Sequence, residues 1–228
     1  MELVQFELQD KVATIKIQNG KVNAISHQVI AELNEALDHA EETGAVVIIT
    51  GQEGIFSGGY DLKTMQKSMD HATALVAEGS TLTRRMLAFP TPIIAACSGH
   101  AIAKGSFILL CSDYRIGAKG PFKLGLNEVA IGMTMHQAGI EMARGRIPTN
   151  YFNRSVMNAE IFDVETAVDA GFLDKLVDAD QLMTEAKALA EEYKKLNMKA
   201  HHGTKLKSRK ALLEAMDAAI EVDRTTTF

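Results

Sequence analysis

The chain has 228 residues, of which 46% are hydrophobic and 23% charged, and its formal net charge is −5. This length and composition fit one soluble globular domain of ordinary size. The negative balance argues against nucleic acid or an anionic membrane as the main partner, although the basic cluster Lys205, Lys207, Arg209 and Lys210 could either meet a phosphorylated ligand or form a solvated helix face.

The two cysteines, Cys97 and Cys111, lie in apolar runs and have no metal-ligand spacing. Such positions predict buried free thiols, which are typical of a reducing compartment. The first residues lack the basic and apolar regions of a signal peptide, and no apolar run is long enough to span a bilayer. We therefore expect a cytoplasmic protein.

The chain begins with the pattern of a β-hairpin followed by a helix. Residues 4–8 and 12–17 alternate between apolar and polar side chains around a short turn, which predicts two half-buried antiparallel strands. Ser26 then has the position of an N-cap before an amphipathic segment that Gly44 ends.

Buried strands and glycine-bearing junctions follow. Residues 45–51 and 92–99 are continuous apolar runs, as expected of strands that are covered on both faces, and residues 112–118 predict a third strand. Two junctions, at residues 56–62 and 98–105, each connect the end of a strand to the start of a helix. Buried strands that alternate with helices predict an α/β fold with crossover connections.

The remaining segments are mainly helical. A long helical region after the first junction is expected to break or kink near Gly79, and residues 105–111 predict a shorter helix. From Asp163 the pattern is helical again, with a short strand at residues 173–177. The tail, residues 182–222, predicts one or two amphipathic helices.

Glu128 is the most informative single residue, because it lies among apolar residues and glycine in the segment 124–129. An unpaired buried charge is costly, so such a glutamate belongs at a water-facing turn or in a functional cleft. The two junctions present unpaired helix N–H groups, which attract developing negative charge. Together these features suggest proton abstraction next to a carbonyl; neither junction has a nucleotide-binding glycine pattern.

Taken in order, these segments resemble the crotonase (enoyl-CoA hydratase/isomerase) superfamily over nearly the whole chain. The matching segments are residues 21–26, 56–62, 92–96, 113–116 and 167–177. The resemblance implies an α/β fold in which residues 1–180 form a crotonase-like spiral of ββα units and residues 181–228 a C-terminal helical oligomerisation region. It also implies an acyl-CoA thioester substrate, no cofactor other than the coenzyme A of the substrate, and a homotrimer or hexamer.

The resemblance also implies roles for individual residues. By position, the backbone N–H groups of Tyr60 and Lys104 would form the oxyanion hole. The family usually has glycine at the second position, and the Lys104 ammonium could alternatively meet the phosphates of coenzyme A. The residues implied to bind the substrate are Asn23, Ala24, Ser57, Gly58, Gly59, Asp61, Leu62, Gly105 and Phe107.

The acid positions separate two activities within the superfamily. Hydratases of this family use two glutamates to activate water; here Phe107 occupies the first position and Glu128 the second. This one-glutamate pattern resembles the 3,2-enoyl-CoA isomerases. It implies that Glu128 takes a proton from C2 and returns it to C4, in an apolar pocket that raises its pKa and excludes water.

Several alternatives stay open at this point. The chain could be an enoyl-CoA hydratase, another crotonase-fold lyase or hydrolase, or a non-catalytic subunit that binds coenzyme A. His136 is a possible second acid or base, and Asp61 is expected to cap the helix that starts at Leu62. His201 and His202 are expected to be exposed, without a third ligand for a metal.

Overall fold

The computed structural model describes residues 1–225 and contains two β-sheets surrounded by helices. The strands of the larger sheet are β1 (Val4–Gln9), β2 (Val12–Ile17), β3 (Val46–Thr50), β5 (Ile93–Cys97), β7 (Tyr114–Ala118) and β10 (Lys175–Val177). Their spatial order is β1-β2-β3-β5-β7-β10; β1 and β2 are antiparallel, and every other neighbouring pair is parallel. This arrangement confirms the predicted α/β class.

The hairpin at the start of the chain forms as predicted. Val4 pairs with Ile17, and the turn between the strands places Asp10 and Lys11 at φ 47° and 62°. Two successive residues in the left-handed region make the tight turn whose twist matches that of the strands.

The second sheet was not anticipated from the sequence. Its strands are β4 (Gly54–Ser57), β6 (Gly99–Ile102), β8 (Leu124–Gly125) and β9 (Ile161–Phe162), in that spatial order. They have two to four residues each, too few for a periodic pattern to show. Because β4, β6 and β8 each follow a strand of the larger sheet, the chain repeats strand, strand and helix, which confirms the spiral of ββα units.

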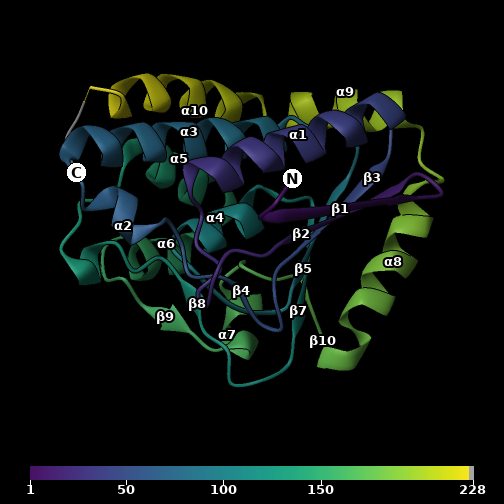
Figure 1. Cartoon of the computed structure of the whole chain (residues 1–228), viewed down its shortest axis with the longest axis horizontal. Coiled ribbons are helices and arrows are strands. Elements are labelled where there is room, and N and C mark those ends of the chain that lie inside the picture. Colours follow the sequence, from purple (N-terminus) through teal and green to yellow (C-terminus); the bar gives the residue numbers. More distant parts are fainter. Residues whose placement is uncertain (226–228) are drawn as a thin grey trace.

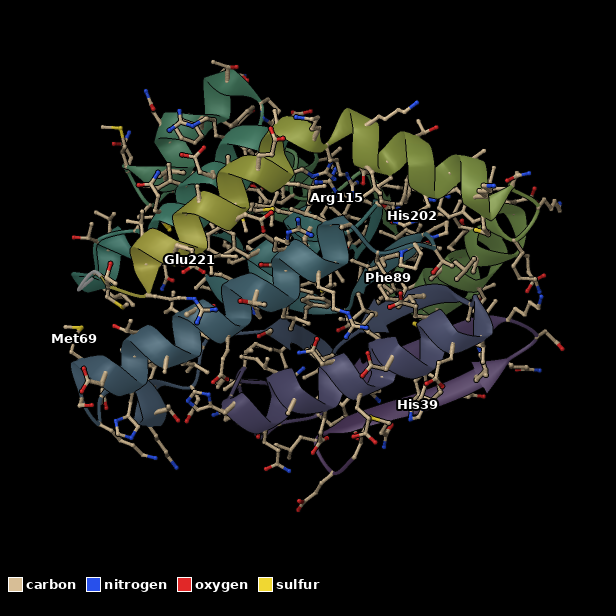
Figure 2. The ribbon with its side chains drawn as sticks, turned by 90° about the horizontal axis from the view of Figure 1, so that it is seen from above. His39, Met69, Phe89, Arg115, His202 and Glu221 are labelled. Carbon is tan, nitrogen blue, oxygen red and sulfur yellow. The ribbon has the colours of Figure 1, made fainter. Side chains whose placement is uncertain are left out.

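Helices cover both faces of the larger sheet. The longer helices are α1 (His27–Thr43), α3 (Met69–Leu87), α4 (Lys104–Cys111), α5 (Gln137–Arg146), α6 (Thr149–Val156), α8 (Leu182–Tyr193), α9 (Met198–Ser208) and α10 (Lys210–Asp223). Shorter ones are α2 (Leu62–Met65), α7 (Val164–Asp169) and the 3₁₀ turns η1 (Val129–Ile131) and η2 (Ala179–Gln181). Figures 1 and 2 show α1, α3 and α10 side by side in one layer, while α8 packs against the opposite face of the sheet.

Helix α3 differs from the prediction at Gly79. The helix runs without interruption from Met69 to Leu87, and the chain breaks earlier, between α2 and α3. A Cβ atom at position 79 would lie 2.2 Å from the hydroxyl of Tyr60, so the glycine provides space for that side chain. Packing, and not helix termination, therefore explains this glycine.

The tail forms three helices instead of the one or two predicted. The apolar side of α10 packs against α3 and α5 of the same chain, through side chains that are almost fully buried: Leu213, Met216, Ala219 and Ile220. This apolar surface is therefore already covered within the protomer. No helix within residues 1–225 is both long and apolar enough to cross a membrane.

The basic cluster of the tail divides into two pairs. Lys205 and Arg209 are held at the start of β7, where both pair with Asp113, and they also donate to backbone carbonyls at the end of α3 and just beyond it. Lys207 and Lys210 are exposed. Near the same end of α3, a ring nitrogen of His202 lies 3.1 Å from the Ala88 carbonyl, so this histidine is half-buried and not exposed as predicted (Figure 2).

Candidate active site

Glu128 is positioned by the turn that leaves β8 and enters η1. Its side chain is only 7% exposed, and its Oε2 atom has no hydrogen-bond partner within residues 1–225. Burial raises the pKa of Glu128 to about 7, while its own backbone N–H and the positive charge of Lys104 oppose the rise. A carboxylate in this state can accept a proton near neutral pH.

Phe107 and His136 contact each other in the core of the protein. Their ring centroids are 5.4 Å apart and their planes meet at 73°, an edge-to-face contact. The contact depends on Gly139, because a Cβ atom there would lie 2.7 Å from His136 Cε1 and 2.9 Å from Phe107 Cζ. The pKa of His136 is lowered to about 3 by burial and by the charge of Lys104, so its ring is neutral at pH 7.

The two strand-to-helix junctions lie next to each other because β4 and β6 are parallel neighbours. Gly59 has φ 103°, and a Cβ atom at this position would lie 3.0 Å from Ala103 Cβ and 3.6 Å from the backbone nitrogen of Lys104. Within residues 1–225, neither the Tyr60 nor the Lys104 backbone N–H donates to a described acceptor. Two N–H groups are thus brought together by segments that are more than forty residues apart in the sequence.

Lys104 is compatible with the backbone of this junction. The left-handed residue is Ala103, at φ 50°, and Lys104 is the first residue of α4. The Cβ atom of Lys104 therefore imposes no strain at the position where the family usually has glycine.

The side chain of Lys104 points into the protein and not toward a coenzyme A phosphate in solvent. The residue is 1% exposed, and its ammonium donates to the Gly79 carbonyl at 2.5 Å and to Thr83 Oγ1 at 3.3 Å. The ammonium also lies 5.5 Å from the centre of the Tyr60 ring. The alternative in which this lysine reaches the phosphates is therefore wrong.

The side chain of Asn23 has a structural role. The side chain is fully buried; its amide donates to the carbonyls of Ile17 and Phe56, at 3.0 and 2.8 Å, and its oxygen accepts from the Asn19 N–H at 2.8 Å. All these partners are internal, so Asn23 fixes the loop that carries the half-buried Ala24 beside the first junction.

The other predicted substrate-binding residues form the two junctions themselves. Ser57 Oγ accepts from the Gly59 N–H at 3.2 Å, and a Cβ atom on Gly105 would lie 2.4 Å from the Ser57 carbonyl, which explains the glycine at the start of α4. Asp61 caps α2 as predicted, with its carboxylate accepting from the N–H and hydroxyl of Thr64. Gly58 and Leu62 are exposed.

Three residues of the site have no sequence signal that would reveal them. Gly79 and Thr83 lie on α3, and Gly139 lies on α5; each acts through a neighbour that is distant in the chain. A glycine or threonine within a helical pattern carries no mark of such a contact. Residues 1–225 contain no cluster of three or more histidine, cysteine or acidic side chains suited to a metal ion.

The chain is similar in sequence to known proteins of one family. The model of the enoyl-CoA hydratase/isomerase family matches residues 7–227. A probable enoyl-CoA hydratase of Bacillus subtilis is 30% identical over 198 residues, which cover 85% of this chain and 76% of that protein.

Two solved structures are also close in shape. An enoyl-CoA hydratase/isomerase family protein from Pseudomonas syringae is 60% identical, with a TM-score of 0.98, and the match covers 100% of this chain and 99% of that one. The apo structure of an Mtb enoyl-CoA isomerase is 36% identical, with a TM-score of 0.93 and 97% of each chain covered.

Proposed function

The chain belongs to the enoyl-CoA hydratase/isomerase family, and on that premise we propose that it converts 3-enoyl-CoA into 2-enoyl-CoA thioesters. Glu128 is the single base of this proposal, and the backbone N–H groups of Tyr60 and Lys104 form its oxyanion hole. The relatives are named both hydratase and isomerase, so the choice between these activities depends on the chemistry of the site.

The observation that carries the proposal is the environment of Glu128. Its Oε2 is buried and has no hydrogen-bond partner within residues 1–225, and the position of the first hydratase glutamate holds Phe107, which is packed edge-on against a neutral His136. A hydratase must hold and activate water, for which two carboxylates serve. A phenyl ring at that position can neither accept a proton nor orient a water molecule.

The reaction follows from these groups. A thioester makes its α-carbon acidic, and the two N–H groups stabilise the negative charge that develops on the thioester oxygen. Glu128 breaks the C–H bond at C2 by accepting the proton, and the electron pair spreads into a dienolate. The same carboxyl then gives the proton to C4, which moves the double bond into conjugation. One base is enough for both steps, because the proton is only moved from C2 to C4 of the same substrate.

A panel of coenzyme A esters tests the proposal. 3-Hexenoyl-CoA should gain the absorbance of a conjugated thioester, faster than crotonyl-CoA loses it by hydration, and a saturated acyl-CoA should release no free thiol. Glu128→Gln is the control for a contaminating activity. Faster hydration would assign the chain to the hydratases, thiol release would indicate a hydrolase, and binding without turnover would indicate a non-catalytic subunit; each of these results overturns the proposal.

A further inference from the structure

Asp223 is a buried carboxylate at the end of α10. The residue is 1% exposed, and its two oxygens accept from two backbone N–H groups at the start of α5: Oδ1 from Gln137 at 2.7 Å and Oδ2 from Ala138 at 2.8 Å. These donors are 86 and 85 residues from Asp223 in the sequence. Asp223 therefore caps a helix that belongs to a distant part of the chain.

The position of Asp223 is unfavourable for its own helix. The C-terminal end of a helix carries the negative end of its dipole, which disfavours a carboxylate, and burial removes the water that would solvate the charge. Burial accordingly raises the pKa of Asp223, while the two N–H groups oppose the rise. The favourable interactions come from α5, because the first turn of a helix has unpaired N–H groups and the positive end of the dipole. This carboxylate thus serves α5 and not α10.

The first turn of α5 also contacts α4. Its N-cap residue is His136, whose side chain makes no capping hydrogen bond within residues 1–225. The His136 ring packs edge to face on Phe107 of α4, with the centroids 5.4 Å apart, and Gly139 leaves the space that both rings occupy. The start of α5 is therefore connected to α10 through Asp223 and to α4 through His136.

We propose that Asp223 is a positioning residue: by capping α5 from the C-terminal helix, it holds His136 against Phe107 and so fixes the ring that stands where a hydratase carries its first glutamate. Each link is a direct neighbour of the next, since Asp223 binds the N–H groups of residues 137 and 138, which follow His136 in the chain. The effect on the reaction rests on the proposed function, whereas the cap and the ring contact are properties of the free protein.

The two ends of α5 are held by different groups. Arg146, at its end, donates to the carbonyls of Leu110 and Ser112 at 2.7 and 2.9 Å, which joins this end to the end of α4. The first turn has Asp223 as its cap. Without that acceptor the first turn frays while the last turn stays in place, and the contact between the His136 and Phe107 rings loosens. A looser ring at position 107 admits water more readily, so hydration should rise relative to isomerisation.

The first test uses the wild-type protein alone. After correction for intrinsic rates, the amides of Gln137 and Ala138 should exchange hydrogen at least about tenfold more slowly than those of Thr149 and Asn150, because hydrogen bonds to a charged acceptor are strong. Thr149 and Asn150 begin α6, where no side chain caps the helix within residues 1–225. Exchange followed by NMR gives the comparison, and equal protection in the two helices overturns the inference.

The second test is Asp223→Asn, which keeps the shape of the side chain but turns one acceptor oxygen toward α5 into an NH₂ donor. The amides of residues 137 and 138 should lose about tenfold in protection. The ¹³Cε1 signal of His136, identified by its loss in His136→Leu, should shift, as it should in Phe107→Leu. Asp217→Asn is the matched control, since it changes an exposed carboxylate on the same helix and should leave both readouts unchanged.

A second variant covers the case in which Asp223→Asn does not fold. Asp223→Glu keeps both acceptor oxygens and displaces them by one methylene group, so the same amides should lose protection and the His136 signal should shift. A His136 signal that stays in place, in whichever of the two variants folds, overturns the inference.

Activity provides a readout that a purely structural role would not change. In Asp223→Asn, the rate of crotonyl-CoA hydration relative to 3-hexenoyl-CoA isomerisation should rise about threefold or more, and this rise should disappear in a Phe107→Leu background, because residues in one contact network do not act additively. An unchanged ratio, or an equal rise in both backgrounds, overturns the role of Asp223. If exchange and the His136 signal respond as expected while the wild type shows no isomerisation, the cap stands and the proposed function fails.

Discussion

The ring of Phe107 meets that of His136 edge to face, with 5.4 Å between the centroids. By the family resemblance, Phe107 stands at the position where a hydratase would carry its first glutamate. Since both rings are buried and the imidazole is neutral, neither offers water a charged partner. The contact therefore connects the sequence difference at position 107 to the isomerase activity that we propose.

Phe107→Glu should raise hydration of crotonyl-CoA relative to isomerisation of 3-hexenoyl-CoA, because a second carboxylate can hold water beside Glu128. The variant should also be less stable, since the new carboxyl is buried among apolar groups. The ratio of the two rates, measured on one preparation, is the readout, and Phe107→Leu controls for loss of the ring. A ratio that stays constant in Phe107→Glu would show that position 107 does not control access of water.

Glu128→Gln should keep the fold and lose at least about a hundredfold in kcat, the usual contribution of a general acid–base group. The amide has the shape of the carboxyl but cannot accept the proton from C2. The measurement is isomerase turnover of purified protein, with circular dichroism to verify folding. Turnover near that of the wild type would exclude Glu128 as the base.

Gly79→Ala should destabilise the protein by about 2 kcal/mol, because the new methyl group would overlap the Tyr60 hydroxyl in a packed core. Gly203→Ala is the matched control, since Gly203 also lies within a helix and a Cβ atom there would meet nothing within 4 Å. The control should stabilise α9 by up to about 1 kcal/mol. Denaturant unfolding of both variants measures the contrast, and equal effects would contradict the packing role of Gly79.

Glu32 should make the free energy of unfolding depend on pH in the acidic range. Burial alone would raise its pKa, but N–H groups of Glu2, Leu3 and Val4 and the Gln28 side chain outweigh burial and lower it. A carboxyl whose pKa is lower in the folded state stabilises the fold above its unfolded pKa, and this contribution is lost as pH falls through the folded value.

Glu32→Gln should therefore cost about 1.5–3 kcal/mol at pH 7, the range for hydrogen bonds to a charged acceptor, and the difference from the wild type should shrink below about pH 4. Unfolding in urea at several pH values gives the comparison. Glu35→Gln, an exposed change on the same helix, serves as control. A pH-independent cost would show that charge on Glu32 does not matter.

We expect the chain to assemble as a homotrimer or hexamer. The apolar side of α10 cannot supply the reason, because it is covered within the protomer. Instead, Val129, Ile131 and Met157 are 44%, 53% and 62% exposed, and the first and last of these line a hollow of about 530 Å³. Exposed apolar groups of this kind favour association. Light scattering at micromolar concentration is the measurement, and a monomer would refute the expectation.

The sequence by itself determined the larger sheet, its hairpin and the choice of Glu128 as the proposed base. Alternation over residues 4–17, continuous apolar runs at β3 and β5, and the caps at Ser26 and Gly44 are local signals, because each depends on residues close together in the chain. Glu128 was found for the same reason: a single carboxylate in an apolar segment is visible without the fold.

Only the tertiary structure decided what surrounds that carboxylate. The second sheet is built from strands too short to show a period, and it brings Tyr60 and Lys104 together from separate turns of the spiral. The Lys104 ammonium donates to the carbonyl of Gly79 on a distant helix, and the same glycine leaves space for the Tyr60 ring. Such contacts arise from chain crossings and close packing, and a linear pattern of residues does not record them.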